Sequence, residues 1–265
     1  MHLDYWHTQT ADQPLFPDLE WSRPENRAFA GKLLIIGGNA HGFAAPAEAY
    51  GQSLRAGIGA VHALLPDAIQ KIVGRIIAEA DYAPSTPSGS FSQKALAEML
   101  AYASWADGVL LAGDLGRNSE TAIALEKFLQ KCAQPVVLTR DAVDYVTTAP
   151  QSITDRPGTT LVLSLSQLQR LGKALKIPEP VQFSMSLMQL IQWLHRCTLQ
   201  FPLNIVVHHA DAFCVAVAGQ VSTTKDTRQR RVWRLQQAAH ASVWLIQNPS
   251  KPFEALTVAM RLGAP

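Results

Sequence analysis

The chain has 265 residues, 48% of them apolar, and its 23 basic and 21 acidic side chains leave a formal net charge of +2. This length suits one large α/β domain or two small ones. The basic residues are dispersed and no apolar run reaches about 18 residues, so we expect neither a nucleic-acid partner nor a membrane span.

Residues 1–30 are rich in proline, tryptophan and acidic groups, and the stretch from Met1 to Asp12 lacks the basic and apolar regions of a secretory signal. We interpret them as an irregular arm, anchored by Trp6, Phe16 and Trp21, that packs onto a single domain formed by residues 31–265.

The cysteines are few, odd in number and widely spaced, and no C-x-x-C pair is present. This pattern favours neither a zinc site nor a disulfide framework. We therefore expect buried thiols in a reducing cytoplasm. The three residues are Cys132, Cys197 and Cys214.

From residue 33 onward, apolar runs alternate with amphipathic segments, which predicts an α/β fold with a largely parallel central sheet and helices on both faces. Strands are expected at 33–36, 60–65, 109–112, 135–138, 160–163, 204–207 and 212–216, the last two as a pair. Helices are expected at 46–56, at 67–79, around 124–132, from Phe183 through Leu194, and at about 228–247 and 252–262.

Two glycine-rich loops follow strands of this sheet. The first is Gly37, Gly38, Asn39, Ala40, His41 and Gly42, and the second is Gly113, Asp114, Leu115, Gly116, Arg117 and Asn118. Ligands of parallel sheets bind beyond the carboxyl ends of the strands, where backbone N–H groups can hold an anion. Either loop alone equally fits a tight turn without a ligand. The pair favours one crevice for a small molecule.

Two further segments leave alternatives open. Asp141 follows the strand at 135–138 and either faces the same crevice or caps the next helix. Residues 82–92 form a Ser/Pro/Gly loop that is either a lid or, more simply, a surface connection.

His208 and His209 are adjacent in an expected strand and would point to opposite faces of the sheet. They are therefore poorly placed to share a metal ion, and we expect no protein-bound metal.

In order and spacing, residues 31–145 resemble the ADP-dependent NAD(P)H-hydrate dehydratases of the ribokinase-like superfamily. The resemblance rests on Gly31-Lys-Leu-Leu-Ile-Ile-Gly-Gly38, on Ala45-Pro46 and on Leu54-Arg-Ala-Gly-Ile-Gly59. It continues with Ala112-Gly-Asp-Leu-Gly-Arg117 and Thr139-Arg-Asp-Ala142. The resemblance implies a ribokinase-like, carbohydrate-kinase-like fold. It also implies a lyase activity that repairs nicotinamide nucleotides.

The resemblance weakens in the C-terminal half. The family's Thr-Pro-His-Pro-Gly-Glu turn corresponds to Val162-Leu-Ser-Leu-Ser-Gln167, and its Lys-Gly strand end corresponds loosely to His208-His209. Its Gly-Thr-Gly-Asp segment is replaced by Trp233-Arg-Leu-Gln236, which puts Gln236 at the position of the catalytic Asp. Glutamine exchanges no proton near neutral pH, so the usual mechanism cannot run unchanged.

Three functions follow from this resemblance. The first is a divergent dehydratase, weak or inactive by the usual mechanism, in which Asp114 or Asp141 supplies the carboxylate beside His41 or His208. The second is a pseudoenzyme that binds a nucleotide or NAD(P)-like ligand without catalysis. The third and least favoured is a small-molecule kinase.

The resemblance also implies cofactors, partners and contacts. The cofactor is ADP or ATP, with Mg²⁺ accompanying the nucleotide. The partners are a nucleotide or dinucleotide and further copies of the chain in a homo-oligomer. The predicted ligand contacts are Gly37, Gly38, Asn39, His41, Gly42, Gly113, Leu115, Gly116, Arg117 and His208.

Overall fold

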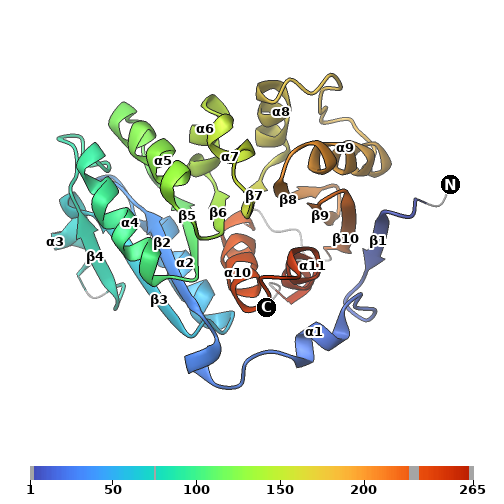
Figure 1. The fold of residues 1–265 in the computed structure, drawn as a ribbon, viewed down its shortest axis with the longest axis horizontal. Helices are drawn as coiled ribbons and strands as arrows, with labels where there is room; N and C mark the ends of the chain where they lie inside the picture. Colours follow the sequence, from blue (N-terminus) through green and yellow to red (C-terminus); the bar gives the residue numbers. More distant parts are fainter. Residues whose placement is uncertain (1–2, 75, 227–232, 263–265) are drawn as a thin grey trace.

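A ten-stranded sheet forms the centre of the protein, with strand order β1-β10-β9-β8-β7-β6-β5-β2-β3-β4 (Figure 1). The computed structural model describes residues 3–74, 76–226 and 233–262. Strand pairs are parallel throughout, except that β9 runs antiparallel to both β8 and β10. The strands are β1 Trp6–Gln9, β2 Lys32–Gly37, β3 Ala60–Pro66, β4 Ala80–Ala83, β5 Gly108–Gly113, β6 Val136–Thr139, β7 Thr159–Leu163, β8 Leu203–His209, β9 Ala212–Val217 and β10 Gln220–Lys225.

Helices cover both faces of this sheet. One face carries α4 Leu96–Trp105, α5 Ser119–Lys131, α6 Asp141–Thr148, α7 Gln151–Thr154, α8 Leu165–Ala174 and α9 Leu187–Gln200. The other carries α2 Ala44–Arg55, α10 Arg234–Gln247 and α11 Pro252–Leu262, with α1 Pro17–Trp21 against α11 (Figure 1). The short elements are α3 Gln70–Val73 and the 3₁₀ turns Arg27–Phe29, Asp67–Ile69 and Gln93–Ala95.

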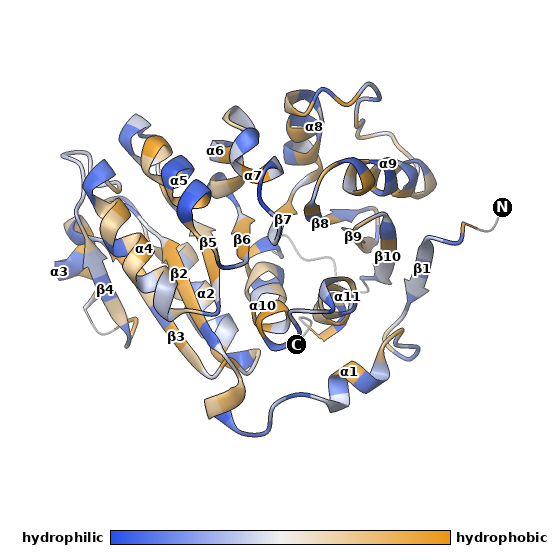
Figure 2. Ribbon diagram, viewed as in Figure 1, coloured by the Kyte–Doolittle hydropathy of each residue, from blue (hydrophilic) through white to orange (hydrophobic). Residues whose placement is uncertain are grey.

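The central strand β2 shows why the sheet needs two layers of helices. Leu34 and Ile36 pack into the core on the α4–α5 side, whereas Leu33 and Ile35 pack against α2 and α10. All four side chains are fully buried, and each contributes about 1.5–3 kcal/mol of hydrophobic free energy. The apolar colouring of β2, β5 and β6 in Figure 2 follows from this burial on both faces.

The predicted α/β architecture is confirmed, as are the largely parallel sheet and the pairing of β8 with β9, which the structure shows to be antiparallel. The helix predicted at 67–79 is wrong beyond α3, because Gly74 follows it with a positive φ of 53°. The short outer strands β1, β4 and β10 were not predicted, since their sequences lack a continuous apolar run.

Two predicted contacts are also wrong. Phe183 lies before α9 and is 65% exposed, so it is not part of the apolar face of that helix. Trp21 is 88% exposed and anchors nothing, whereas Trp6 donates a hydrogen bond from Nε1 to Thr223 Oγ1 at 3.0 Å. Residues 228–232, where the predicted 228–247 helix would begin, lie outside the described residues.

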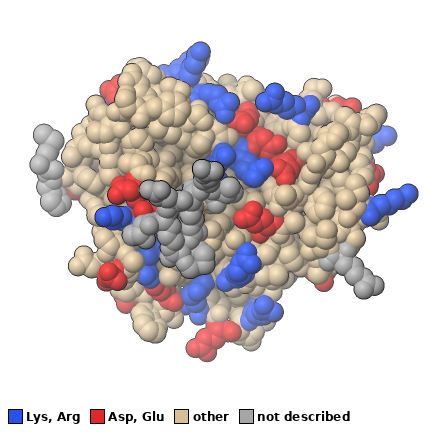
Figure 3. All heavy atoms as spheres, turned by 180° about the vertical axis from the view of Figure 1, so that it is seen from behind, with Lys and Arg blue, Asp and Glu red and all other residues tan. Residues whose placement is uncertain are grey.

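On the face turned away from the view of Figure 1, acidic and basic residues lie side by side (Figure 3). The part of the chain that the structure describes contains no helix long and apolar enough to span a bilayer.

Candidate functional site

The two glycine-rich loops meet at the carboxyl edge of the sheet. Gly38 donates its backbone N–H to Gly113 O at 3.0 Å, and Asn39 Nδ2 donates to Asp114 O at 2.5 Å. The loops are neighbours because β2 and β5 are adjacent parallel strands. The two loops therefore lie side by side in the fold.

Glycine is required at Gly37 and Gly113 because other protein groups occupy the space that a side chain would need. A Cβ on Gly37 would lie 2.5 Å from Gly113 O, and one on Gly113 would lie 2.8 Å from both Arg140 Cβ and Asp141 Oδ1. Gly113 also has a φ of 103°, a conformation that L side chains rarely adopt. These glycines allow loop-to-loop packing.

The segment after β4 packs onto both loops. Gly89 O accepts the backbone N–H of Ala40 at 2.9 Å, and Ser88 Oγ accepts a hydrogen bond from Asn118 Nδ2 at 2.9 Å. Part of the loop predicted at 82–92 is therefore hydrogen-bonded to the first and second glycine-rich loops.

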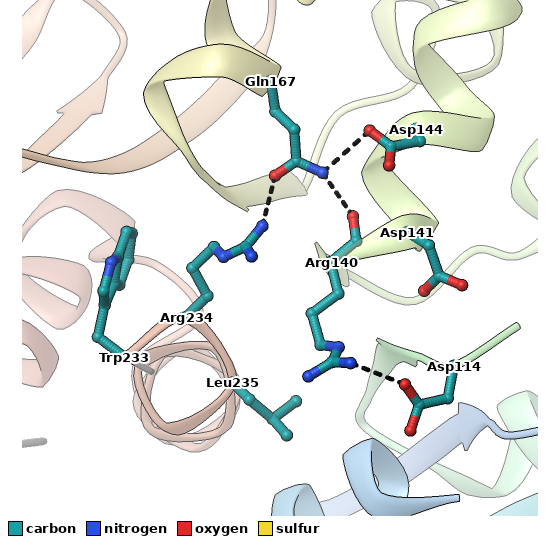
Figure 4. Close-up of a pocket in the computed structure, with 8 residues that line it drawn as sticks. All are labelled: Asp114, Arg140, Asp141, Asp144, Gln167, Trp233, Arg234 and Leu235. Carbon is teal, nitrogen blue, oxygen red and sulfur yellow. Dashed lines mark hydrogen bonds and ion pairs between the residues drawn. The ribbon is translucent and has the colours of Figure 1, made fainter. Parts of the chain in front are cut away.

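A polar cavity of about 390 Å³ opens beside these loops, between the ends of β5 to β7 and the first turn of α10 (Figure 4). This volume lies within the range of small-molecule sites, about 300–1,000 Å³. We call it the first cavity. It is lined by Asp114, Arg140, Asp141, Asp144, Gln167, Trp233, Arg234 and Leu235.

Asp114 and Arg140 form an ion pair at the edge of the first cavity. Arg140 Nη2 lies 2.8 Å from Asp114 Oδ1, while Asp114 Oδ2 accepts the backbone N–H of Ala45 at 2.8 Å in the first turn of α2. Both carboxylate oxygens of Asp114 are therefore already engaged. Asp114 and Arg140 also have positive φ angles, 57° and 55°, and such strain is found most often at functional sites.

Asp141 has a different environment. Its Oδ2 accepts the backbone N–H of Leu115 at 2.9 Å, and its Oδ1 is buried without a hydrogen bond to any described residue. Burial raises the pKa of this carboxyl above its ordinary value of 3.8, the Leu115 N–H opposes that change, and the Asp114 carboxylate adds to it. Asp141 is thus the better placed of the two carboxylates to exchange a proton.

Gln167 connects the two sides of the first cavity. Its Nε2 donates to Arg140 O at 2.7 Å and to Asp144 Oδ1 at 3.0 Å, and its Oε1 accepts from Arg234 Nη1 at 2.9 Å (Figure 4). Arg170 Nη2 lies 2.6 Å from the same Asp144 oxygen. Gln167 is 3% exposed, so this network fixes α6, α8 and α10 relative to one another.

Arg234 begins α10 and brings a positive charge into the first cavity. Burial, followed by the nearby Arg140 guanidinium, lowers the pKa of Arg234, but arginine remains protonated at neutral pH. Within the described part of the chain, its side chain hydrogen-bonds only to the neutral amide of Gln167. The positive end of the α10 dipole lies at the same place, and the first turn carries no acidic residue.

The other predicted site residues are distributed around these loops. His41 is exposed, Leu115 is fully buried in the core, and neither Gly37 to Gly42 nor His208 lines the first cavity. His208 instead lies 3.2 Å from Asp226, and its ring packs against Trp233 with centroids 5.7 Å apart. Gly116 and Arg117 line a second cavity, which shares Asp141 and Asp144 with the first. Gln236 lines neither cavity.

Sequence reasoning did not identify Arg140, Asp144, Gln167 and Arg234 as a group. The only local signal was the position of Arg140 and Gln167 in loops directly after expected strands. Arg234 had only an indirect signal, its place in Trp233-Arg-Leu-Gln236, the segment that replaces the Gly-Thr-Gly-Asp of the resembled family.

A largely parallel sheet between two helical layers, with a polar cavity at the carboxyl edge, places the protein among the doubly wound α/β folds. Neither a protein-family model nor a curated protein matches the sequence. Solved structures do match in shape, so the resemblance predicted from sequence is confirmed at the level of the fold.

Three solved structures illustrate this similarity. A ribokinase-like superfamily protein from Enterococcus faecalis V583 has a TM-score of 0.76 at 16% identity, covering 100% of this chain and 88% of its own. The ADP/ATP-dependent NAD(P)H-hydrate dehydratase from Bacillus subtilis, co-crystallized with ATP/Mg²⁺, has a TM-score of 0.64 at 15% identity over 94% and 87%. An ADP complex of Bacillus subtilis pyridoxal kinase has a TM-score of 0.56 at 9% identity over 86% and 88%.

Proposed function

We propose that this protein binds an anionic, phosphate-bearing small molecule of the nucleotide class in the first cavity. The observation that supports this most directly is Arg234, a partly buried cation whose described partner is a neutral amide. The Asp144 carboxylate favours the charged form of Arg234 but is itself paired with Arg170, so a bound anion would add a charge-assisted partner for Arg234.

The pairing of the other charges agrees with this assignment. Asp114 is paired with Arg140, and Asp144 is paired with Arg170. Burial raises the pKa of Asp141. Of the two guanidinium groups that line the first cavity, Arg140 is ion-paired with a described residue, whereas Arg234 forms no ion pair with one.

The nucleotide class is suggested by proteins of the same fold. The Bacillus subtilis dehydratase was co-crystallized with ATP/Mg²⁺, and the pyridoxal kinase is an ADP complex. We extend to this chain ADP or ATP, with Mg²⁺ accompanying the nucleotide, or an NAD(P)-like dinucleotide. The free, buried cysteines fit the cytoplasmic location that we include in the proposal.

We further propose that dehydration of hydrated NADH by the usual mechanism is weak or absent. The first turn of α10 carries Arg234 and Leu235 instead of glycine, so a phosphate cannot approach its backbone as closely as a glycine-rich turn would allow. Gln236 supplies no acid or base.

A second candidate is an enzyme that transfers a proton through Asp141. The buried, unpartnered Oδ1 and the raised pKa of Asp141 favour this carboxyl over Asp114. The His41 and His208 partners expected from the sequence are absent from the lining of the first cavity, where the nearest charged partner of Asp114 is Arg140.

The proposed binding is tested by a thermal-shift screen with ADP, ATP, NAD, NADP and pyrophosphate, followed by calorimetry. A ligand at 100 times its Kd should stabilise the wild type by about 2.7 kcal/mol. Arg234→Gln should weaken binding by about tenfold or more, because a hydrogen bond to a charged group is lost. Arg196→Gln, which removes an exposed arginine of α9 outside both cavities, is the matched control.

Equal affinities of wild type and Arg234→Gln would contradict the proposal, as would no binding of any of the five compounds. Turnover is measured separately from the recovery of NADH absorbance with hydrated NADH and ADP. Any residual activity should disappear in Asp141→Asn if the second candidate is correct.

A further inference from the structure

The second cavity lies on the other side of the first turn of α6 and has a volume of about 390 Å³. It shares Asp141 and Asp144 with the first cavity, so the two are adjacent. Its lining also includes Gly116, Arg117, Asn118, Ala122, Tyr145, Thr148 and Arg170.

Most polar groups around the second cavity are already bonded within the protein. Tyr145 Oη donates to Gly116 O at 2.6 Å and accepts the Asn118 N–H at 3.1 Å. Asn118 Oδ1 caps α5, and Thr148 Oγ1 donates to Tyr145 O at 2.6 Å. Apart from the guanidinium groups of Arg117 and Arg170, few donors of this lining remain unbonded.

The remaining surfaces suit a flat ring. The phenol ring of Tyr145 is held in place by both hydrogen bonds of its hydroxyl, and Ala122 of α5 contributes only a methyl group. Arg117 is exposed and makes no ion pair with a described residue. Aromatic rings and guanidinium groups are the side chains on which planar bases stack.

We propose that the second cavity holds the planar heteroaromatic ring of the ligand whose anionic group lies in the first cavity. This inference rests on the proposed function. A nucleotide carries both parts, a base and a phosphate joined through a sugar, and the shared Asp141 and Asp144 separate the sites for the two parts.

Trp233 offers the competing position for a ring, because it lines the first cavity. Its indole is already packed edge-on against Phe213, with centroids 5.3 Å apart, and against His208. These contacts cover part of the indole surface that a base would need. The Tyr145 side of α6 is therefore favoured.

The test uses Ala122→Leu, which fills the second cavity without removing a hydrogen bond. Adenosine, pyrophosphate and ADP are titrated calorimetrically into wild type, Ala122→Leu, Trp233→Leu and the control Ala97→Leu, an exposed position on α4. Ala122→Leu should weaken adenosine and ADP by about tenfold, the scale of one lost stacking contact, and leave pyrophosphate unchanged. Ala97→Leu should change none of the three.

Unchanged adenosine and ADP affinities in a folded Ala122→Leu protein would overturn the ring subsite while leaving the anion site intact. Loss of adenosine binding in Trp233→Leu alone would overturn it as well. Failure of wild type to bind either pyrophosphate or ADP would count against the proposed function instead, and adenosine binding that Ala122→Leu blocks would still support the ring subsite. No binding of any probe to wild type would overturn both.

Discussion

Replacing Arg140 with glycine should lower the affinity for pyrophosphate without lowering the free energy of unfolding. Arg140 has a φ of 55°, and a non-glycine residue held in such a conformation costs about 1–3 kcal/mol. Glycine removes that strain but adds about 0.5–1 kcal/mol of backbone entropy. Loss of the ion pair with Asp114 costs about 0–1 kcal/mol, because the arginine side chain is 37% exposed. The net free energy of unfolding should be unchanged or higher by roughly 1 kcal/mol.

Alanine at the same position is the matched comparison. It also removes the guanidinium but retains the strained φ, so Arg140→Gly should be more stable than Arg140→Ala by about 0.5–2 kcal/mol. That difference corresponds to a Tm gap of about 2–4 °C per kcal/mol for a domain of this size. Urea titrations give the free energies, and calorimetry with pyrophosphate gives the affinities.

The affinity for pyrophosphate should fall in both variants, whatever their stability. Both variants should lose about tenfold or more in pyrophosphate affinity, because each lacks the guanidinium in the first cavity. An alanine variant as stable as the glycine variant would refute the strain argument. Wild-type affinity in Arg140→Gly would refute the placement of Arg140 in the anion site.

Three other outcomes are expected. The pKa of Asp141 in the folded protein lies above 3.8, so its contribution to stability is full below that pH and is lost as the pH rises through the raised pKa. In Asp141→Asn, the free energy of unfolding measured with urea should therefore vary less with pH across this acidic range. Gly89→Ala should strongly lower the Tm, since a Cβ would lie 2.2 Å from a neighbouring alanine Cβ, whereas Gly42→Ala has open space and should change it little. Burial raises the pKa of both Cys197 and Cys214 to about 12, so an aromatic disulfide reagent should label them only after unfolding; rapid native-state labelling would contradict their burial.

The sequence predicts those strands whose own residues are apolar and which the fold buries. The fully buried runs of β2 and β5 read as strands because every residue in them is apolar or glycine after Lys32. The edge strand β4, Ala80–Ala83, contains Asp81 and Tyr82, so nothing in its composition marks it as a strand. Its conformation is set by pairing with β3, a tertiary effect.

The candidate site was predictable only where it coincides with a loop after a strand. Asp114 and Asp141 were identified in this way, and the structure places both at the first cavity. Arg234 was not identified, because its role depends on the N-terminus of α10 facing the ends of β5 to β7 across the sheet. Periodicity in one helix carries no information about which loops that helix will face.

The interlocked glycines also explain why the resemblance is strong in one half of the chain and weak in the other. A side chain at Gly37 would collide with the Gly113 carbonyl, and one at Gly113 would collide with Arg140 and Asp141, so both positions are restricted regardless of what the protein binds. At the start of α10, by contrast, a large side chain such as Arg234 is accommodated without disturbing the helix. Such a pattern of glycines therefore indicates the fold and not the activity. A search that relies on the pattern will group active and inactive members of a fold together. The chemistry of each member depends instead on the residues at the start of α10, on the other side of the first cavity.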